Sequence, residues 1–430
     1  MKTRTLVLAA LAAAVLGTAT LAARSGDGPP IRPDTEGLVI HEWGTFTSVQ
    51  GSDGVGLEGL HHEEEALPWF VYDRAAVREC PLRDRGYKGL EVPVTSVMQK
   101  METPVIYVHT ATKRRIRLRV DFVDGLLTQW YPVVDRLGPP EGAVKDGPLD
   151  LRTVKRSFLE WEFEALPRTG EAPDRIPGVD AGDPWAFARE VDAAWLRTTP
   201  REDAGRSGPV EAEHYLFYRG LGTFDLPVTV KALPGGSHEL QNATGHPLTA
   251  AFVLDMWEKR ARMLALGAVT AGDPVVFDLA GEPAGEKAAV VETLRAKVKE
   301  ALLAGGLFAD EAEAMVKTWA RQWFASEGTR VIYLVPRAFT DRILPMRISP
   351  KPDSLVRVLV GRLEFLAPET EAEVARALRN RTSEDPGVRA AAESRLARLG
   401  RFLEPHLRRV AATDPALRDA ADEALEESVR

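Results

Sequence analysis

Residues 115–122 read Arg115-Ile116-Arg117-Leu118-Arg119-Val120-Asp121-Phe122, and this stretch points to the fold class. Apolar and charged side chains alternate along it without a break. A period of two puts the apolar side chains on one face of an extended strand and the charged ones on the other. The stretch therefore predicts a half-buried β-strand, and Asp124-Gly125 predicts a turn into an antiparallel return over residues 126–131.

Similar extended runs surround this strand and are separated by turns, with little helix between them. That pattern favours an antiparallel sandwich over a parallel sheet. We predict a β-rich, sandwich-like body over residues 31–280, with long loops at 138–150, 166–183 and 199–210 and a short helix from Asp183-Pro184 to Leu196. The other predicted strands are 38–47, 103–110, 158–164, 214–218, 226–232, 237–241 and 248–254.

The pattern changes after Gly281, where helix and strand mix over residues 281–368. Apolar residues at helical spacing predict a helix over 286–304 that stops at Gly305-Gly306. Asp310 with Glu313 resembles an N-cap and capping box, which predicts a second helix that ends near Gly328. Residues 329–335 predict one more strand.

The segment 369–430 is predicted to be helical and contains an internal repeat. Residues 385–396 recur as residues 414–425 with Asp, Pro, Arg, two Ala and Leu at matching positions. Asp caps each helix and Pro takes its first position. The pair resembles a HEAT-like repeat, whose stacked helices favour contact with a protein partner. The whole chain is therefore predicted to be α+β.

The first 23 residues resemble a secretory signal peptide. A basic start, Met1-Lys2-Thr3-Arg4, precedes an apolar stretch from Leu6 to small residues at Ala22 and Ala23. An uncleaved anchor is the alternative, because the apolar stretch approaches the length that spans a bilayer. With cleavage, we expect a protein of the periplasm or extracellular space without a membrane span.

Composition and charge exclude further classes of protein. The 430 residues carry 55 basic and 63 acidic side chains, a net charge of −8 that argues against a nucleic-acid binder. Cys80 is the sole cysteine, so an internal disulfide is excluded. A catalytic Cys80 would need a histidine base beside it, and an inert buried thiol is the favoured interpretation.

The densest set of metal-ligand residues lies near the start of the predicted mature chain. His41 and Glu42 precede His61 and His62, and three glutamates follow directly. Imidazole and carboxylate groups bind zinc and related metals. These four residues are the candidate metal ligands, and no other cofactor is predicted. The alternative is an acidic surface turn carrying two histidines.

Two further patterns have ordinary explanations. Gly54-Val55-Gly56-Leu57-Glu58-Gly59 matches a dinucleotide-binding motif, but no βαβ unit follows it, so a loop is favoured. Arginines and lysines recur from Arg330 to Arg362 and could face an anion. A solvated face, or pairing with the acidic C-terminal helices, is the favoured interpretation.

Three segments resemble a group of uncharacterised exported bacterial proteins: the His-Glu-Trp-Gly-Thr-Phe-Thr run at 41–47, residues 101–107 and residues 328–337. The resemblance implies export and carries no catalytic residue. We therefore expect a non-catalytic binding or envelope-assembly protein whose C-terminal helices contact a protein partner. The alternative is a metal-dependent hydrolase that uses His41, Glu42, His61 and His62.

Overall fold

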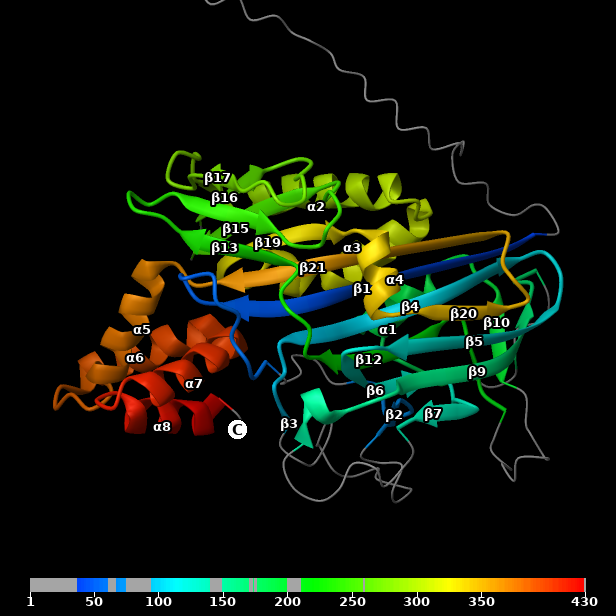
Figure 1. Ribbon diagram of the computed structural model, residues 1–430, viewed down its shortest axis with the longest axis horizontal. Coiled ribbons are helices and arrows are strands. Elements are labelled where there is room, and N and C mark those ends of the chain that lie inside the picture. Colours follow the sequence, from blue (N-terminus) through cyan, green and yellow to red (C-terminus); the bar gives the residue numbers. More distant parts are fainter. Residues whose placement is uncertain are drawn as a thin grey trace, which may run out of the picture. The chain divides into compact units, whose positions relative to one another are not determined.

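Figure 1 shows the computed structural model, which describes residues 37–60, 67–74, 94–139, 149–169, 173, 176–198, 210–257 and 260–428. These residues form sheets and helices in a mixed arrangement, so the α+β class is confirmed. The predicted signal peptide at 1–23, His61, His62 and Cys80 lie outside the described residues.

Strand β5 (Arg114–Phe122) confirms the period-two prediction, because Ile116, Leu118 and Val120 are buried and Arg117 is exposed. The predicted antiparallel return is wrong. Strand β6 (Gly125–Tyr131) follows the turn but joins another sheet, where it pairs with β12 (Leu216–Gly222). Every residue of β6 is buried, and a strand covered on both faces belongs inside a layered body.

The described residues form a ten-stranded sheet that includes both β1 (Leu38–Gln50) and β21 (Ser354–Phe365) near its middle. β1 runs parallel to β21 on one side and antiparallel to β4 (Gln99–Thr110) on the other. The sheet therefore combines strands from both sides of residue 280. Its strand order is β18 (Gly285–Glu286), β16 (Arg260–Ala265), β15 (Ala251–Trp257), β19 (Gly328–Val335), β21, β1, β4, β12, β6 and β2 (Tyr72–Asp73).

Three smaller sheets accompany it. The six-stranded sheet contains β11 (Ala212–Glu213), β10 (Trp195–Thr198), β9 (Ser157–Leu166), β5 and β20 (Met346–Ser349), with β7 (Arg136–Gly138) also paired to β9. The three-stranded sheet contains β13 (Val228–Ala232), β14 (His238–Asn242) and β17 (Val275–Phe277), and β3 (Val94–Thr95) pairs with β8 (Leu149–Asp150). A 3-10 turn, η2 (Leu151–Thr153), follows β8.

One face of the ten-stranded sheet shares a hydrophobic core with the six-stranded and three-stranded sheets. Ile40 and Tyr218 from the large sheet join Leu118 and Trp161 from β5 and β9 and Leu240 from β14 in this core. Burial of apolar surface is the main stabilising contribution at such a contact. The narrower expectation of a sandwich-like body stays a prediction.

Helices cover the opposite face. α2 (Lys287–Ala304) and α3 (Ala309–Phe324) pack Leu294 and Trp323 against Trp43 and Ile332 of the sheet. α1 (Pro184–Arg189) joins them and ends before the predicted boundary at Leu196, which is a correction. Trp195–Thr198 instead forms β10, because these residues pair with β9.

Helix α3 also begins earlier than predicted. Its N-cap is Phe308, and the carboxylate of Glu311 accepts the Phe308 backbone N–H at 2.8 Å. The predicted pair of Asp310 and Glu313 is therefore wrong as the capping box. Glu311, the third residue of the helix, has the same role two residues earlier in the chain, because its carboxylate accepts an otherwise unpaired backbone N–H.

The C-terminal segment forms α5 (Pro368–Asn380), α6 (Pro386–Leu399), the 3-10 turn η4 (Gly400–Leu403), α7 (Glu404–Thr413) and α8 (Arg418–Ser428). Figure 1 shows these helices, in orange and red, beside the ends of β1 and β21. Asp385 caps α6 as predicted. The second repeat copy differs, because Asp414 ends α7 and α8 begins only at Arg418. The HEAT-like resemblance stays a prediction.

Candidate metal centre and neighbouring polar clusters

The register between β1 and β4 brings two histidines together on the helix-covered face. His41 lies opposite Tyr107, and His109 lies opposite Val39. Side chains two residues apart on a strand share a face, so His41 and His109 are diagonal neighbours. Their ring centroids are 5.2 Å apart.

Glu311, in the first turn of α3, connects the two rings. His41 Nδ1 lies 2.7 Å from Glu311 Oε2, and His109 Nε2 lies 2.8 Å from Glu311 Oε1. The cluster therefore joins two neighbouring strands to the start of a helix that lies 202 residues after His109. One ligand atom from each residue lies within 4.8 Å of the others, as metal ligands require.

This cluster is closed to solvent. His41, His109 and Glu311 are 2%, 5% and 0% exposed, and the ring of Phe308 packs against both imidazoles at 4.4 and 4.8 Å. Burial alone would raise the pKa of Glu311. The hydrogen bonds from His109 and His41 outweigh it and lower that pKa to about 2, so the carboxylate is ionised.

Glu42 points to the other face of β1 and forms a second buried cluster. The Arg357 guanidinium on β21 donates from Nε to Glu42 Oε2 at 2.6 Å, and the Tyr218 hydroxyl donates to Glu42 Oε1. Arg357 Nη1 also donates to Asp341 of α4 (Arg337–Ile343) at 2.7 Å. Burial raises the pKa of Tyr218, and the neighbouring Glu42 carboxylate raises it further.

The structure thus separates the predicted ligands His41 and Glu42 and leaves His61 and His62 undescribed. It adds His109, which lies near the end of the strand predicted over residues 103–110, and Glu311, which the sequence analysis missed. The sequence nevertheless contains a pattern that indicates a buried Glu311. It stands four residues before Met315 on the same apolar stripe as Trp319 and Trp323, and a carboxylate on a buried stripe needs a partner.

The solvated face expected between Arg330 and Arg362 is present only in part. Arg337, Arg342, Arg347 and Lys351 are exposed as expected. Arg330, Arg357 and Arg362 are instead buried on β19 and β21. Arg330 and Arg362 share the Glu364 carboxylate, with Nε to Oε1 distances of 2.8 and 2.7 Å. Buried charges are tolerated only when paired in this way.

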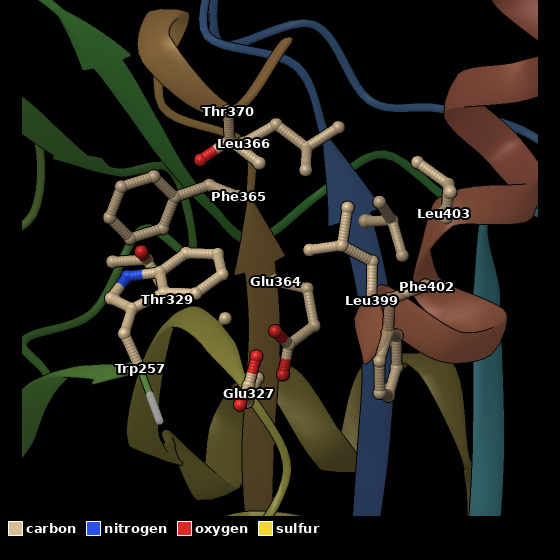
Figure 2. Close-up of a pocket in the computed structure, with 12 residues that line it drawn as sticks. Trp257, Glu327, Thr329, Glu364, Phe365, Leu366, Thr370, Leu399, Phe402 and Leu403 are labelled. Atoms are coloured by element: carbon tan, nitrogen blue, oxygen red, sulfur yellow. The ribbon is translucent and has the colours of Figure 1, made fainter. Parts of the chain in front are cut away.

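A cavity lies where β19 and β21 meet the C-terminal helices (Figure 2). Trp257, Glu364 and Phe402 are among its lining residues, and the Arg362 guanidinium stacks on the Phe402 ring at 4.2 Å. Its volume is about 20 Å³. That is room for about one water molecule, so the cavity does not accommodate an organic substrate.

Comparison with known proteins gives limited similarity. No family model and no curated protein matches the chain. Among solved structures, the zebrafish (Danio rerio) Fcho1 Mu homology domain with a bound Eps15 peptide aligns at TM-score 0.30 and 5% identity, over 78% of this chain and 99% of that one. The yeast delta-COP-I mu-homology domain aligns at TM-score 0.27 and 8% identity, over 78% and 98% of the two chains.

No helix among the described residues combines the length and the apolar character needed to cross a bilayer.

Proposed function

We propose that this chain is an exported protein that binds a protein partner without catalysing a reaction, and that helices α5–α8 make the contact. The observation that carries the proposal is the outer face of α6. Ala390, Ala391, Ser394 and Ala397 on this helix are exposed, while Leu396 and Leu399 on the other side are buried.

Small side chains suit this role. Alanine loses no rotamer freedom when it is covered, so association over this face costs little side-chain entropy. Residues spaced three and four apart form a ridge, and small ones let another helix approach closely. The partner surface that fits best is the apolar face of a helix.

The C-terminal helices are also held in a fixed position, which lowers the entropic cost of binding. The Glu371 carboxylate of α5 accepts from the Ser52 hydroxyl at 2.7 Å just after β1. Arg409 of α7 pairs with Asp53 at 3.1 Å and with Glu371 at 2.5 Å. Phe402 packs against Val49 in a shared apolar cluster.

The described polar clusters support a role without catalysis. Glu42 pairs with Arg357 inside the sheet. Glu213 is buried against Arg189, which donates from Nη2 to Glu213 Oε2 at 2.6 Å. A catalytic group must reach its substrate. These groups are engaged with the protein itself.

A photo-reactive amino acid placed at Ala391 in the full chain tests the proposal in the native host. The matched control is the same residue at Ala296, an exposed alanine in the middle of α2. We expect one discrete cross-linked protein from Ala391 and none from Ala296. With that protein purified, Ala391→Arg should weaken binding about tenfold or more, and Ala296→Arg should leave it unchanged. Equal cross-linking at both positions would reject the proposed surface.

Export is tested separately by cell fractionation and N-terminal sequencing of the mature chain. We expect the protein in the periplasm or medium with a new N-terminus near Arg24, because small residues precede that position. A chain that stays in the cytoplasm with Met1 intact would reject export.

A further inference from the structure

The His41–His109–Glu311 cluster lies outside helices α5–α8, and it assembles three metal-ligand side chains from distant segments. β1, β4 and α3 each contribute one residue, and all three side chains are buried. Partner binding through α5–α8 does not account for these three buried side chains.

The buried carboxylate of Glu311 has few charged neighbours. An ionised carboxylate taken out of water requires a compensating positive charge. Among the residues that the structure describes, no lysine or arginine lies within ion-pair distance of Glu311, whose ionic partners are the two imidazoles. A cation bound between the two imidazoles and the carboxylate would supply that charge.

The donor atoms of the three side chains suit a transition-metal ion. Two imidazole nitrogens and one carboxylate oxygen are a set that zinc accepts, with bonds of about 2.0–2.2 Å. Ligand atoms around tetrahedral zinc then lie roughly 3.3–3.5 Å apart. The two nitrogen–oxygen distances here are 2.7 and 2.8 Å, so small side-chain rotations would convert two hydrogen bonds into two metal bonds.

Phe308 holds the carboxylate and the two imidazoles in place. The Phe308 backbone N–H donates to Glu311 Oε2 at 2.8 Å and holds the carboxylate toward the rings. Such a hydrogen bond to a ligand fixes its direction and increases metal affinity. The Phe308 ring packs against both imidazoles and helps to hold them in place.

We propose that His41 Nδ1, His109 Nε2 and the Glu311 carboxylate bind one divalent transition-metal ion of the zinc type, in a structural site that fastens the start of α3 to β1 and β4. A second carboxylate oxygen or one water completes the coordination. Each imidazole would bind the ion through one ring nitrogen and carry its proton on the other.

The test uses the purified full chain, stripped with a chelator and then titrated with Zn²⁺ by calorimetry and metal analysis. We expect one equivalent of bound zinc and a higher melting temperature in its presence. Glu311→Gln and His109→Asn should each lower the zinc affinity on the order of 100-fold or more, because each removes a ligand. Circular dichroism verifies that these variants remain folded.

Two control variants separate this site from the other candidate. His246→Asn changes an exposed histidine and should leave binding unchanged. His61→Ala with His62→Ala should also leave it unchanged. Loss of zinc in that double variant, with retention in Glu311→Gln, would overturn the proposal.

X-ray absorption of the zinc-loaded, unmodified chain gives a second measurement that needs no variant. Two imidazoles with oxygen ligands support the proposal, and a sulfur ligand overturns it because the site contains no cysteine. A chain that binds no zinc and melts at the same temperature with or without it would show a metal-free hydrogen-bonded cluster.

Discussion

Arg357 connects three parts of the fold at the scale of a single side chain. Its guanidinium bonds Glu42 on β1, Asp341 on α4 and the Leu344 carbonyl, all from a fully buried position on β21. Removing Arg357 leaves the Glu42 carboxylate buried without its ion-pair partner, and the free-energy cost comes mainly from that loss.

Arg357→Met should lower the free energy of unfolding by about 3–5 kcal/mol, the range for breaking a buried ion pair. Glu42→Gln should destabilise the protein as well, and the double variant should cost less than the sum of the two, because the orphaned charge disappears. Urea denaturation of the four chains measures this coupling. Arg347→Met is the control, because Arg347 pairs with Asp121 while 67% exposed, and it should cost about 0–1 kcal/mol.

His214 makes stability depend on pH. Burial, followed by the charges of Arg168 and Arg189, lowers the pKa of His214 to about 3. The unfolded chain takes up the proton below about pH 6.5 while the folded chain does not, so stability present above pH 6.5 is lost as the pH falls. Between pH 8 and pH 5 this loss is about 2 kcal/mol for His214.

The variant His214→Gln should show a smaller loss of stability between pH 8 and pH 5, measured by urea denaturation at each pH. Part of the loss should remain. Burial also lowers the pKa of His238, and it lowers that of His406 to about 4. A variant with the same pH dependence as the unmodified chain would contradict the assignment to His214.

Strands β19 and β21 pack closely at Gly361, because a glycine has no side chain. Gly361 of β21 lies opposite Tyr333 of β19. A Cβ atom at Gly361 would lie 2.0 Å from Tyr333 Cζ, well inside any contact distance. The tyrosine ring thus occupies the space above the glycine, and the pair fixes how these two strands pack.

Gly361→Ala should therefore destabilise the protein by about 1–3 kcal/mol or more, as overpacking does. Tyr333→Leu in the same chain should restore part of that loss, because it vacates the space. Thermal unfolding measures both. Gly182→Ala serves as the control, since no atom lies within 4 Å of a Cβ there, and its melting temperature should stay within about a degree of the unmodified chain.

These elements show how far the sequence predicts the fold. β5 could be predicted because one of its faces is polar, which leaves the period of two visible. β21 could not, because its arginines resemble a surface patch until Glu42 and Glu364 are brought beside them. Likewise Glu311 is indistinguishable from Asp310 and Glu313 along the chain, and only the fold turns it toward His41, 270 residues away. The burial of the β21 arginines and of Glu311 depends on partners that lie far away along the chain.

At the scale of the whole molecule, β21 links the helical C-terminal segment to the rest. It pairs with β1 and β19 and continues directly into α5. Its loss would open the ten-stranded sheet near its middle, whereas loss of α5–α8 would uncover one end of the sheet, including Val49, Trp257 and the Arg362 guanidinium.

A chain ending after Leu366 should keep the circular dichroism of a folded sheet and melt at a lower temperature than the full chain. A chain ending after Asp353 should lack cooperative unfolding, because β1 and β19 lose their common neighbour. Comparable cooperative melting of both truncated chains would show that β21 is dispensable for the sheet.

The parallel pairing of β1 with β21 also affects how the protein is made. The end of β1 precedes the end of β21 by 315 residues, and a ribosome adding 5–20 residues per second needs roughly 15–60 s to cover that distance. During this interval one side of β1 shows unpaired backbone donors and acceptors to any other nascent chain. A chaperone that shields this edge, or delivery of the unfolded chain to another compartment before the last strand arrives, would keep such chains from joining each other.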